Sequence, residues 1–117
     1  MSFWYLATPY AKYPRGPLAA FEAAIEQAAL LIHEGILVFC PIVHSHYMHK
    51  HIKPLDAHRF WLSFDRTFME VSRGLIVCEL LSWRESRGML EEVLWFTRNS
   101  KPIVYMTPGK VPEELLQ

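Results

Sequence analysis

The chain has 117 residues, of which 51% are hydrophobic and 21% are charged, and its 12 basic residues balance 12 acidic residues. This length and composition predict one globular domain that spans residues 1–117. The balanced charge, without a long block of one sign, argues against a nucleic acid polymer or a membrane surface as partner. No apolar run approaches the ~20 residues of a membrane span, and the N-terminus lacks a signal-peptide pattern, so we expect a cytoplasmic protein.

The predicted elements alternate between short apolar strands and longer amphipathic helices. In chain order they are a strand at 3–7, a helix at 18–34, a strand at 36–40, a long polar, histidine-rich connection at 41–56, a helix at 58–71, a strand at 75–80, a helix at 87–99, a strand at 101–106 and a short terminal helix from about 112. Such alternation predicts parallel βαβ units in a doubly wound α/β sheet with helices on both faces. Cys40 and Cys78 lie within apolar runs, which favours reduced core residues.

This topology also predicts where a ligand binds. In open parallel sheets, ligands occupy the crevice outside the carboxyl ends of the strands, where the strand order reverses. The segments that follow the first three predicted strands are 8–15, 41–51 and 79–92. We therefore expect the functional residues within these segments.

Two adjacent glutamates in the predicted helix 87–99 face different ways. A helical wheel places Leu90, Val93, Leu94 and Phe96 together on one apolar face. Glu91 falls opposite that face, beside Arg98, and is predicted to be a solvated surface charge. Glu92 falls at the border of the face and near the positive end of the helix dipole, which favours an ionised carboxylate. Glu92 is therefore a candidate nucleophile, and the alternative is an ordinary residue at an amphipathic boundary.

The start of the same helix has the features of a ligand cradle. Ser86 at the helix start and Gly88 just inside it leave backbone N–H groups open to an anion or to hydroxyl groups. The alternative is simple capping, either by Ser86 alone or by a capping box formed by Ser82 and Glu85. That alternative explains the serines but not the glycine.

The pattern Ser86-x-Gly88-x-x-x-Glu92, between the strand "LIVCEL" and the strand "KPIVYM", resembles the active-site signature of the nucleoside 2-deoxyribosyltransferase-like superfamily. "YLATPY" resembles the opening motif of that superfamily, and together with "CPIVHSHYM" and "FWLSFD" it is most similar to a short bacterial and phage branch. The resemblance covers nearly the whole chain. It implies a flavodoxin-like or Rossmann-like three-layer sandwich, no cofactor, and a homo-oligomer with sites near subunit interfaces.

The resemblance also implies roles for particular residues. The glutamate matching Glu92 attacks the anomeric carbon of a 2-deoxyribose and displaces the base, and water or a second base completes the reaction. The serine matching Ser86 lies at the sugar 5′ end or its phosphate, and the tyrosine matching Tyr10 or Tyr5 lies near the nucleophile. The aspartate matching Asp65 lies close to the base, where a carboxyl group can transfer a proton. Thr8 and Pro9 of the opening motif are expected to contact substrate.

Some positions depart from the superfamily pattern or leave alternatives open. Many members have an aspartate before the third strand, where this chain has "SRG" at 72–74. Glu79 is either an acidic site residue or a structural ion-pair partner. Arg15 is either a phosphate clamp or a solvated loop residue. Trp83, in a loop, is a better candidate than Trp61 for stacking on a base.

The histidine-rich segment "HSHYMHKH" supports two interpretations. In the first, His44, Ser45 and His46 line the crevice and contact sugar or base, while His49 and His51 are exposed and face a partner subunit. In the second, the imidazoles bind a metal ion in a metal-dependent hydrolase, although no H-E-x-x-H or Cys/His ligand spacing accompanies them. The main alternative to N-glycosidic chemistry is a non-catalytic module of the same fold that binds or senses a nucleotide.

Overall fold

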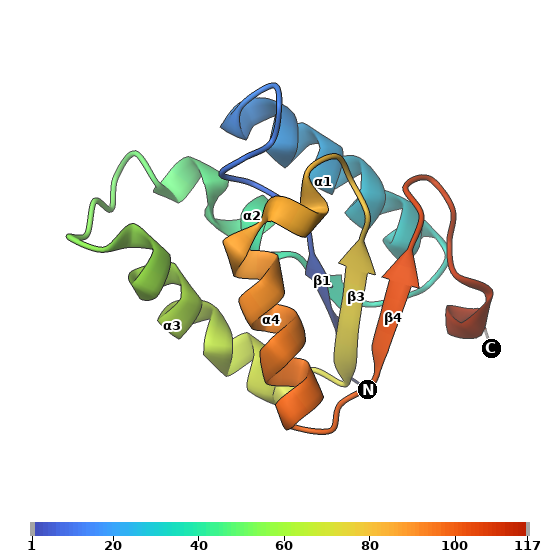
Figure 1. The fold of residues 1–117 in the computed structure, drawn as a ribbon. Coiled ribbons are helices and arrows are strands. Elements are labelled where there is room, and N and C mark those ends of the chain that lie inside the picture. Colours follow the sequence, from blue (N-terminus) through green and yellow to red (C-terminus); the bar gives the residue numbers. More distant parts are fainter. Residues whose placement is uncertain (1, 117) are drawn as a thin grey trace.

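Four short strands form an entirely parallel sheet in the order β2-β1-β3-β4 in the computed structural model, which describes residues 2–116. The elements follow the chain as β1 (Trp4–Ala7), α1 (Pro17–His33), β2 (Val38–Phe39), α2 (Pro41–Ser45), the 3₁₀ turn η1 (His46–Met48), α3 (Ala57–Val71), β3 (Gly74–Cys78), the 3₁₀ turn η2 (Trp83–Glu85), α4 (Arg87–Arg98), β4 (Ile103–Met106) and the 3₁₀ turn η3 (Glu113–Leu115) (Figure 1).

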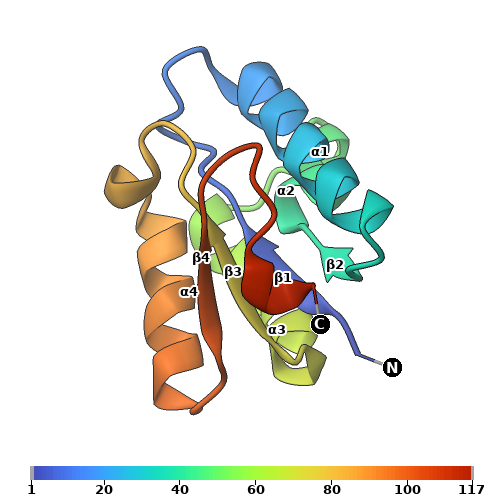
Figure 2. The same ribbon diagram turned by 90° about the vertical axis from the view of Figure 1, so that its right-hand side faces the viewer.

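The helices cover both faces of the sheet, which confirms the predicted three-layer α/β fold. Helices α1 and α2 lie on one face, and α3 and α4 lie on the other (Figure 2). Alternate residues of β1 point into two separate cores: Leu6 packs with Leu31 of α1, whereas Tyr5 packs with Phe96 of α4. This alternation is the two-residue period of a strand buried on both faces. Within residues 2–116, no helix is long and apolar enough to cross a bilayer.

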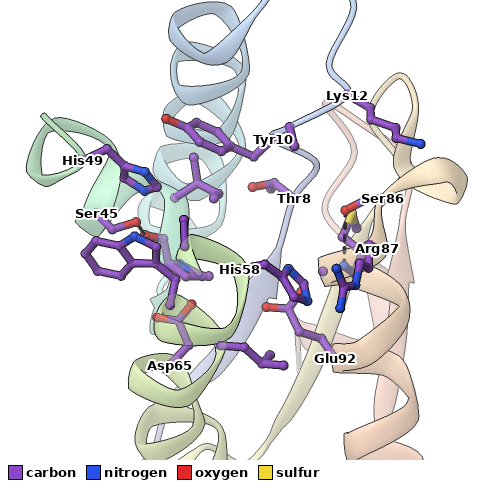
Figure 3. A pocket seen from close by; sticks show the side chains of 18 residues that line it. Thr8, Tyr10, Lys12, Ser45, His49, His58, Asp65, Ser86, Arg87 and Glu92 are labelled. Carbon is purple, nitrogen blue, oxygen red and sulfur yellow. Dashed lines mark hydrogen bonds between the residues drawn. The ribbon is translucent and has the colours of Figure 1, made fainter. Parts of the chain in front are cut away.

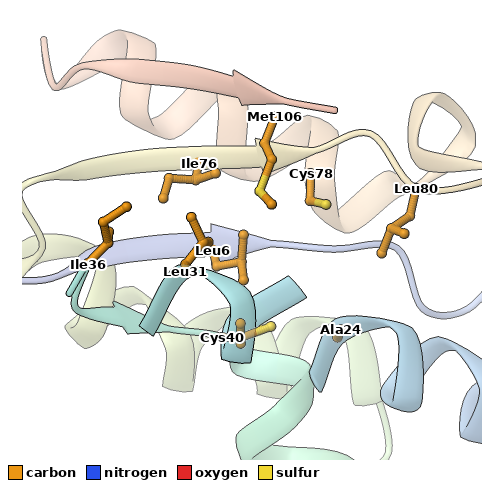
Figure 4. Packing of buried hydrophobic residues seen from close by; sticks show 10 residues of the cluster. Leu6, Ala24, Leu31, Ile36, Cys40, Ile76, Cys78, Leu80 and Met106 are labelled. Atoms are coloured by element: carbon orange, nitrogen blue, oxygen red, sulfur yellow. The ribbon is translucent and has the colours of Figure 1, made fainter. Parts of the chain in front are cut away.

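The centre of the sheet is β3, whose five residues are all buried. Its first residue must be glycine, because a Cβ at Gly74 would lie 2.5 Å from Trp4 Cζ3 and 2.6 Å from the carbonyl oxygen of Pro102. On the α1 face, Ile76 and Cys78 pack with Cys40 (Figure 4). Both cysteines are free and buried, as predicted, and burial raises the pKa of Cys40 to about 11 and that of Cys78 to about 12. They are therefore unreactive core side chains at neutral pH.

The connection predicted as irregular is partly helical. Pro41 ends the second strand and starts α2, because proline is favoured in the first turn of a helix, where its missing N–H costs no hydrogen bond. The strand predicted at 36–40 is correspondingly reduced to Val38–Phe39. The predicted terminal helix is the single turn η3.

Helix α4 is rotated from the orientation that the hydrophobic pattern predicts. Leu90 and Leu94 are 59% and 41% exposed, whereas Met89, Glu92 and Phe96 are buried against the sheet. The wheel was wrong because it counted Glu92 as polar and assigned it to the edge of the apolar face. In the structure, Glu92 lies in the middle of the buried face.

Candidate functional site

A cavity of about 520 Å³ opens at the carboxyl ends of the strands. Strand β2 lies on one side of β1, and the chain then crosses over to place β3 on the other side of β1. The direction in which successive strands are added to the sheet therefore reverses between β1 and β3. The cavity lies next to this point, between the loop after β1, helix α2 and the first halves of α3 and α4. The predicted site residues that line it are Thr8, Tyr10, Ser45, Asp65, Ser86, Gly88 and Glu92.

Glu92 lies at the base of the cavity and is held by a tyrosine from the central strand. The Tyr5 hydroxyl donates a hydrogen bond to Glu92 Oε2 at 2.6 Å, and both side chains are buried. Burial raises the pKa of Glu92 to about 8, and the nearby Asp65 and Glu91 add to this, while the Tyr5 hydrogen bond opposes it. The expectation that the helix dipole keeps Glu92 ionised is therefore wrong at neutral pH, because desolvation outweighs the dipole.

Asp65 brings a second buried carboxyl group to the same cavity. It lies on α3 and is 9% exposed, and its Oδ1 has no hydrogen-bond partner among the described residues. Burial raises the pKa of Asp65 to about 7. Asp65 and Glu92 thus have pKa values near neutrality in one cavity, an arrangement that is characteristic of acid–base chemistry.

The start of α4 forms the opposite part of the cavity wall (Figure 3). Ser86 caps the helix by accepting a hydrogen bond from the Met89 N–H at 3.2 Å, so the simple-capping interpretation accounts for its hydroxyl. Ser82 has a left-handed backbone with φ 65° and does not form the alternative capping box. A Cβ at Gly88 would meet only Ser86 Oγ, at 4.0 Å. Packing therefore does not require glycine there, and its absent side chain leaves the cavity wall open.

The remaining predicted site residues lie outside the cavity: Pro9, Arg15, His44, His46, Glu79 and Trp83. Pro9 is fully buried in the core and Arg15 is exposed on the loop before α1. The backbone N–H of Glu79 continues the sheet by bonding to the Met106 carbonyl. Trp83 packs edge-on against Tyr105, with ring centroids 6.0 Å apart. Tyr5 does not line the cavity either, but its hydroxyl bonds to Glu92, which does.

The histidines are distributed differently from the prediction. His46 does not line the cavity but bonds through Nδ1 to the Tyr10 hydroxyl at 2.8 Å and stacks on Phe21. His44 is exposed and stacks on an α3 side chain. The prediction that His49 is exposed is wrong: it is half-buried, lines the cavity and stacks on Trp61 at 4.9 Å. His51 is exposed as predicted.

Burial lowers the pKa of His49, and the neighbouring His46 adds to this, so the His49 ring is neutral at neutral pH. His49 and Trp61 together form an uncharged aromatic wall, which suits a flat heterocyclic ligand. Among residues 2–116, no group of three or more His, Cys, Asp or Glu side chains is arranged to hold a metal ion.

Sequence reasoning missed three cavity residues with ionisable side chains: Lys12, His58 and Arg87. It was also wrong about Glu91, which is not a free surface charge. Glu91 accepts hydrogen bonds from His58 Nε2 at 2.8 Å and from Arg87 Nε at 3.4 Å. The i, i+4 spacing of Arg87 and Glu91 indicated the second contact, but only the packing of α3 against α4 produces the first.

Comparison with known proteins assigns the chain to a family but does not indicate an activity. No curated protein matches the chain. A family model described as a domain of unknown function, DUF1937, matches residues 2–108. This match spans every strand of the sheet and every residue that lines the cavity, and the resemblance to deoxyribosyltransferases stays a prediction beside it. The chain belongs to the DUF1937 family.

Proposed function

We propose that this protein cleaves or exchanges the N-glycosidic bond of a deoxynucleoside or deoxynucleotide, with Glu92 as the nucleophile. The observation that carries this proposal is the buried Glu92, hydrogen-bonded to Tyr5 and sharing one cavity with a second buried carboxyl group, Asp65. Retaining glycosidases use two carboxyl groups in this way, one as nucleophile and one as acid and then base. The motif resemblance supports the same assignment.

The shape and polarity of the cavity agree with a nucleoside-sized ligand. Its volume of about 520 Å³ lies in the usual range for small-molecule sites. In Figure 3, His49 and Asp65 lie on one side of the cavity and Ser86 and Arg87 lie on the other, with Glu92 between them. The first side suits a base, and the second suits the polar 5′ end of a sugar, so that the anomeric carbon would lie near Glu92.

The proposed reaction has two steps. First, Glu92 Oε1, the carboxylate oxygen that does not accept from Tyr5, bonds to the anomeric carbon while the carbon–nitrogen bond breaks. The bonding electrons move to the base nitrogen, which takes a proton from Asp65. Second, Asp65 takes a proton from water or from an acceptor base, the oxygen of that water or the nitrogen of that base bonds to the anomeric carbon, and the bond to Glu92 breaks.

These roles require Glu92 to be ionised while Asp65 is protonated. Because the pKa of Glu92 is about 8 and that of Asp65 is about 7, this form is the minor one of the two singly ionised forms. Its population is greatest between the two pKa values. We therefore expect a bell-shaped pH–rate profile with its maximum between pH 7 and 8.

One observation favours a second candidate function, a nucleotide-binding or sensing module without chemistry. With a pKa of about 8, Glu92 is mostly protonated at neutral pH, and a neutral carboxyl group is a hydrogen-bond donor rather than a nucleophile. Such a module would bind ligand in the same cavity without releasing base.

The test is to incubate the protein with deoxynucleosides, ribonucleosides and their 5′-monophosphates, with and without an acceptor base, and to follow free base by chromatography. We expect base release from at least one deoxy substrate and a loss of about a thousandfold or more in Glu92→Gln. Glu26→Gln, which removes an exposed charge on α1, is the control and should match the wild type. Unchanged release in Glu92→Gln would contradict the nucleophile, and binding without release would favour the sensing module.

A further inference from the structure

Glu91 joins the two helices that form opposite walls of the cavity. Its Oε2 accepts from His58 Nε2 of α3 at 2.8 Å, and its Oε1 accepts from Arg87 Nε of α4 at 3.4 Å. The Glu91 side chain is 30% exposed and that of His58 is 29% exposed, so water only partly screens this contact. Each carboxylate oxygen thus has its own donor, one from each helix.

The two donors line the cavity, but Glu91 does not. His58 is in the first turn of α3 and Arg87 is the first residue of α4, so both lie at the mouth. The Arg87 side chain is 74% exposed and a long, flexible side chain of this kind samples many conformations unless it is held. Glu91 contacts it through Nε, and no hydrogen bond among the described residues involves the terminal guanidinium nitrogens, which remain available for other partners.

We propose that Glu91 is a positioning residue that holds His58 and Arg87 at the mouth of the cavity, where they bind the polar 5′ end of the nucleoside or nucleotide. This proposal rests on the proposed function for the identity of the ligand. It assigns a role to Glu91, the first glutamate of the pair "EE", which neither the motif resemblance nor the nucleophile assignment uses. Glu91 does not touch the substrate and acts only through its two partners.

The charge of Glu91 has a second, separable effect. It is one of the groups that raise the pKa of Glu92, together with burial and Asp65, while Tyr5 lowers it. The charged and titratable groups near Glu91 are His58 from α3 and Arg87 and Glu92 from α4. Replacing Glu91 by glutamine removes a like charge beside Glu92 and lowers the pKa of Glu92, which is the higher of the two carboxyl pKa values. The falling limb of the pH–rate profile should then move to lower pH. A residue that only stabilised the fold would not shift this limb.

The experiment compares Glu91→Gln with Glu85→Gln, a matched control. Glu85 is exposed on η2, one turn before α4, and no hydrogen bond among the described residues involves its side chain. Binding of the four common deoxynucleosides and their 5′-monophosphates is measured by calorimetry on the Glu92→Gln background, so that turnover is not needed. We expect Glu91→Gln to weaken the tightest of these ligands by about tenfold and Glu85→Gln to leave its Kd unchanged.

A double-mutant cycle then tests whether Glu91 acts through its partners. In a His58→Leu/Arg87→Gln background, Glu91→Gln should have no further effect on Kd, whereas His58→Gln, which keeps a side-chain N–H donor, should bind almost as the parent does. An equal loss in both backgrounds would overturn the proposal, as would an unchanged Kd in Glu91→Gln. Binding that follows these expectations without any base release would overturn the proposed function alone. Failure of all eight ligands to bind would overturn both.

Discussion

Glu92 has lost nearly all contact with water, and one hydrogen bond compensates for part of that loss. Burial penalises the ionised carboxylate, whereas the Tyr5 hydroxyl, at 2.6 Å, stabilises it. Tyr5 cannot ionise in its place, because its own burial and the adjacent Glu92 raise the pKa of the phenol well above its ordinary value. The proton of this pair therefore stays on Tyr5 whenever Glu92 is ionised, and Tyr5 would remain a donor throughout the proposed reaction.

Replacing Tyr5 by phenylalanine tests this contact. Phenylalanine fills the same space between Phe39 and Phe96 but donates no hydrogen bond, so the pKa of Glu92 should rise further. We expect a 10- to 100-fold lower kcat at pH 7, and a falling limb of the pH–rate profile that moves to higher pH, because Glu92 has the higher of the two carboxyl pKa values. Phe39→Leu, which changes the packing but no hydrogen bond, is the control. A falling limb at the same pH in Tyr5→Phe would contradict the role of the tyrosine.

At the same scale, the sequence distinguished Glu92 from Glu91 because adjacent helical residues point in different directions. It did not predict that Tyr5 bonds to Glu92, since the two residues are 87 positions apart and only the packing of α4 on β1 joins them. It also assigned Glu91 to solvent. That error arose because a helical wheel describes one helix, and α3 lies against the side of α4 that the wheel left free.

At the scale of the element, the first turn of α4 combines a cap with an open wall. Ser86 caps the helix, so its hydroxyl has a structural role, and the cavity is kept open by Gly88. Glycine weakens a helix relative to alanine, and no packing contact at this position requires it. A glycine that costs stability without a packing reason is best explained by ligand binding.

Gly88→Ala tests that explanation. The new methyl group meets no atom closer than 4.0 Å, so the free energy of unfolding should rise by up to about 1 kcal/mol in chemical denaturation. The same methyl group lies in the cavity wall, and we expect KM to rise several-fold. Higher stability together with an unchanged KM would show that this glycine has no part in ligand binding.

The elements themselves were predictable to different degrees. The buried strand at Gly74–Cys78 and the helices α1, α3 and α4 follow from runs and periods that the chain carries locally. The segment Pro41–Met48 was predicted as irregular because its polar residues, His44, Ser45 and His46, mask its helical turns. Those turns form through tertiary contacts, such as the stacking of His46 on Phe21, which no local pattern contains.

At the scale of the whole molecule, the topology places the cavity where the sequence predicted it. A parallel sheet that reverses its strand order brings the segments after β1, β2 and β3 to one edge, and these segments supply Thr8, Ser45 and Ser86. Lys12 and His58 were not predicted because their place in the wall depends on how the loop after β1 and the start of α3 fold over the sheet edge.

Exposed apolar side chains also occur across the surface, among them Leu18, Ile25 and Ile32 on one side of α1. Because these side chains are seven residues apart, they form an apolar stripe along one face of the helix. Self-association of the chain, which the motif resemblance implies, stays a prediction.

Glu92 is proposed to form a covalent bond to the sugar, and mass spectrometry of the rapidly quenched reaction would detect that bond. We expect the intact-protein mass to increase by one deoxyribosyl group, with or without its 5′-phosphate, and a digest to place the adduct on the peptide that contains Glu92. Glu92→Gln should show no such adduct under the same conditions. Base release by the wild-type protein with no adduct on Glu92, together with inversion at the anomeric carbon, would contradict the account.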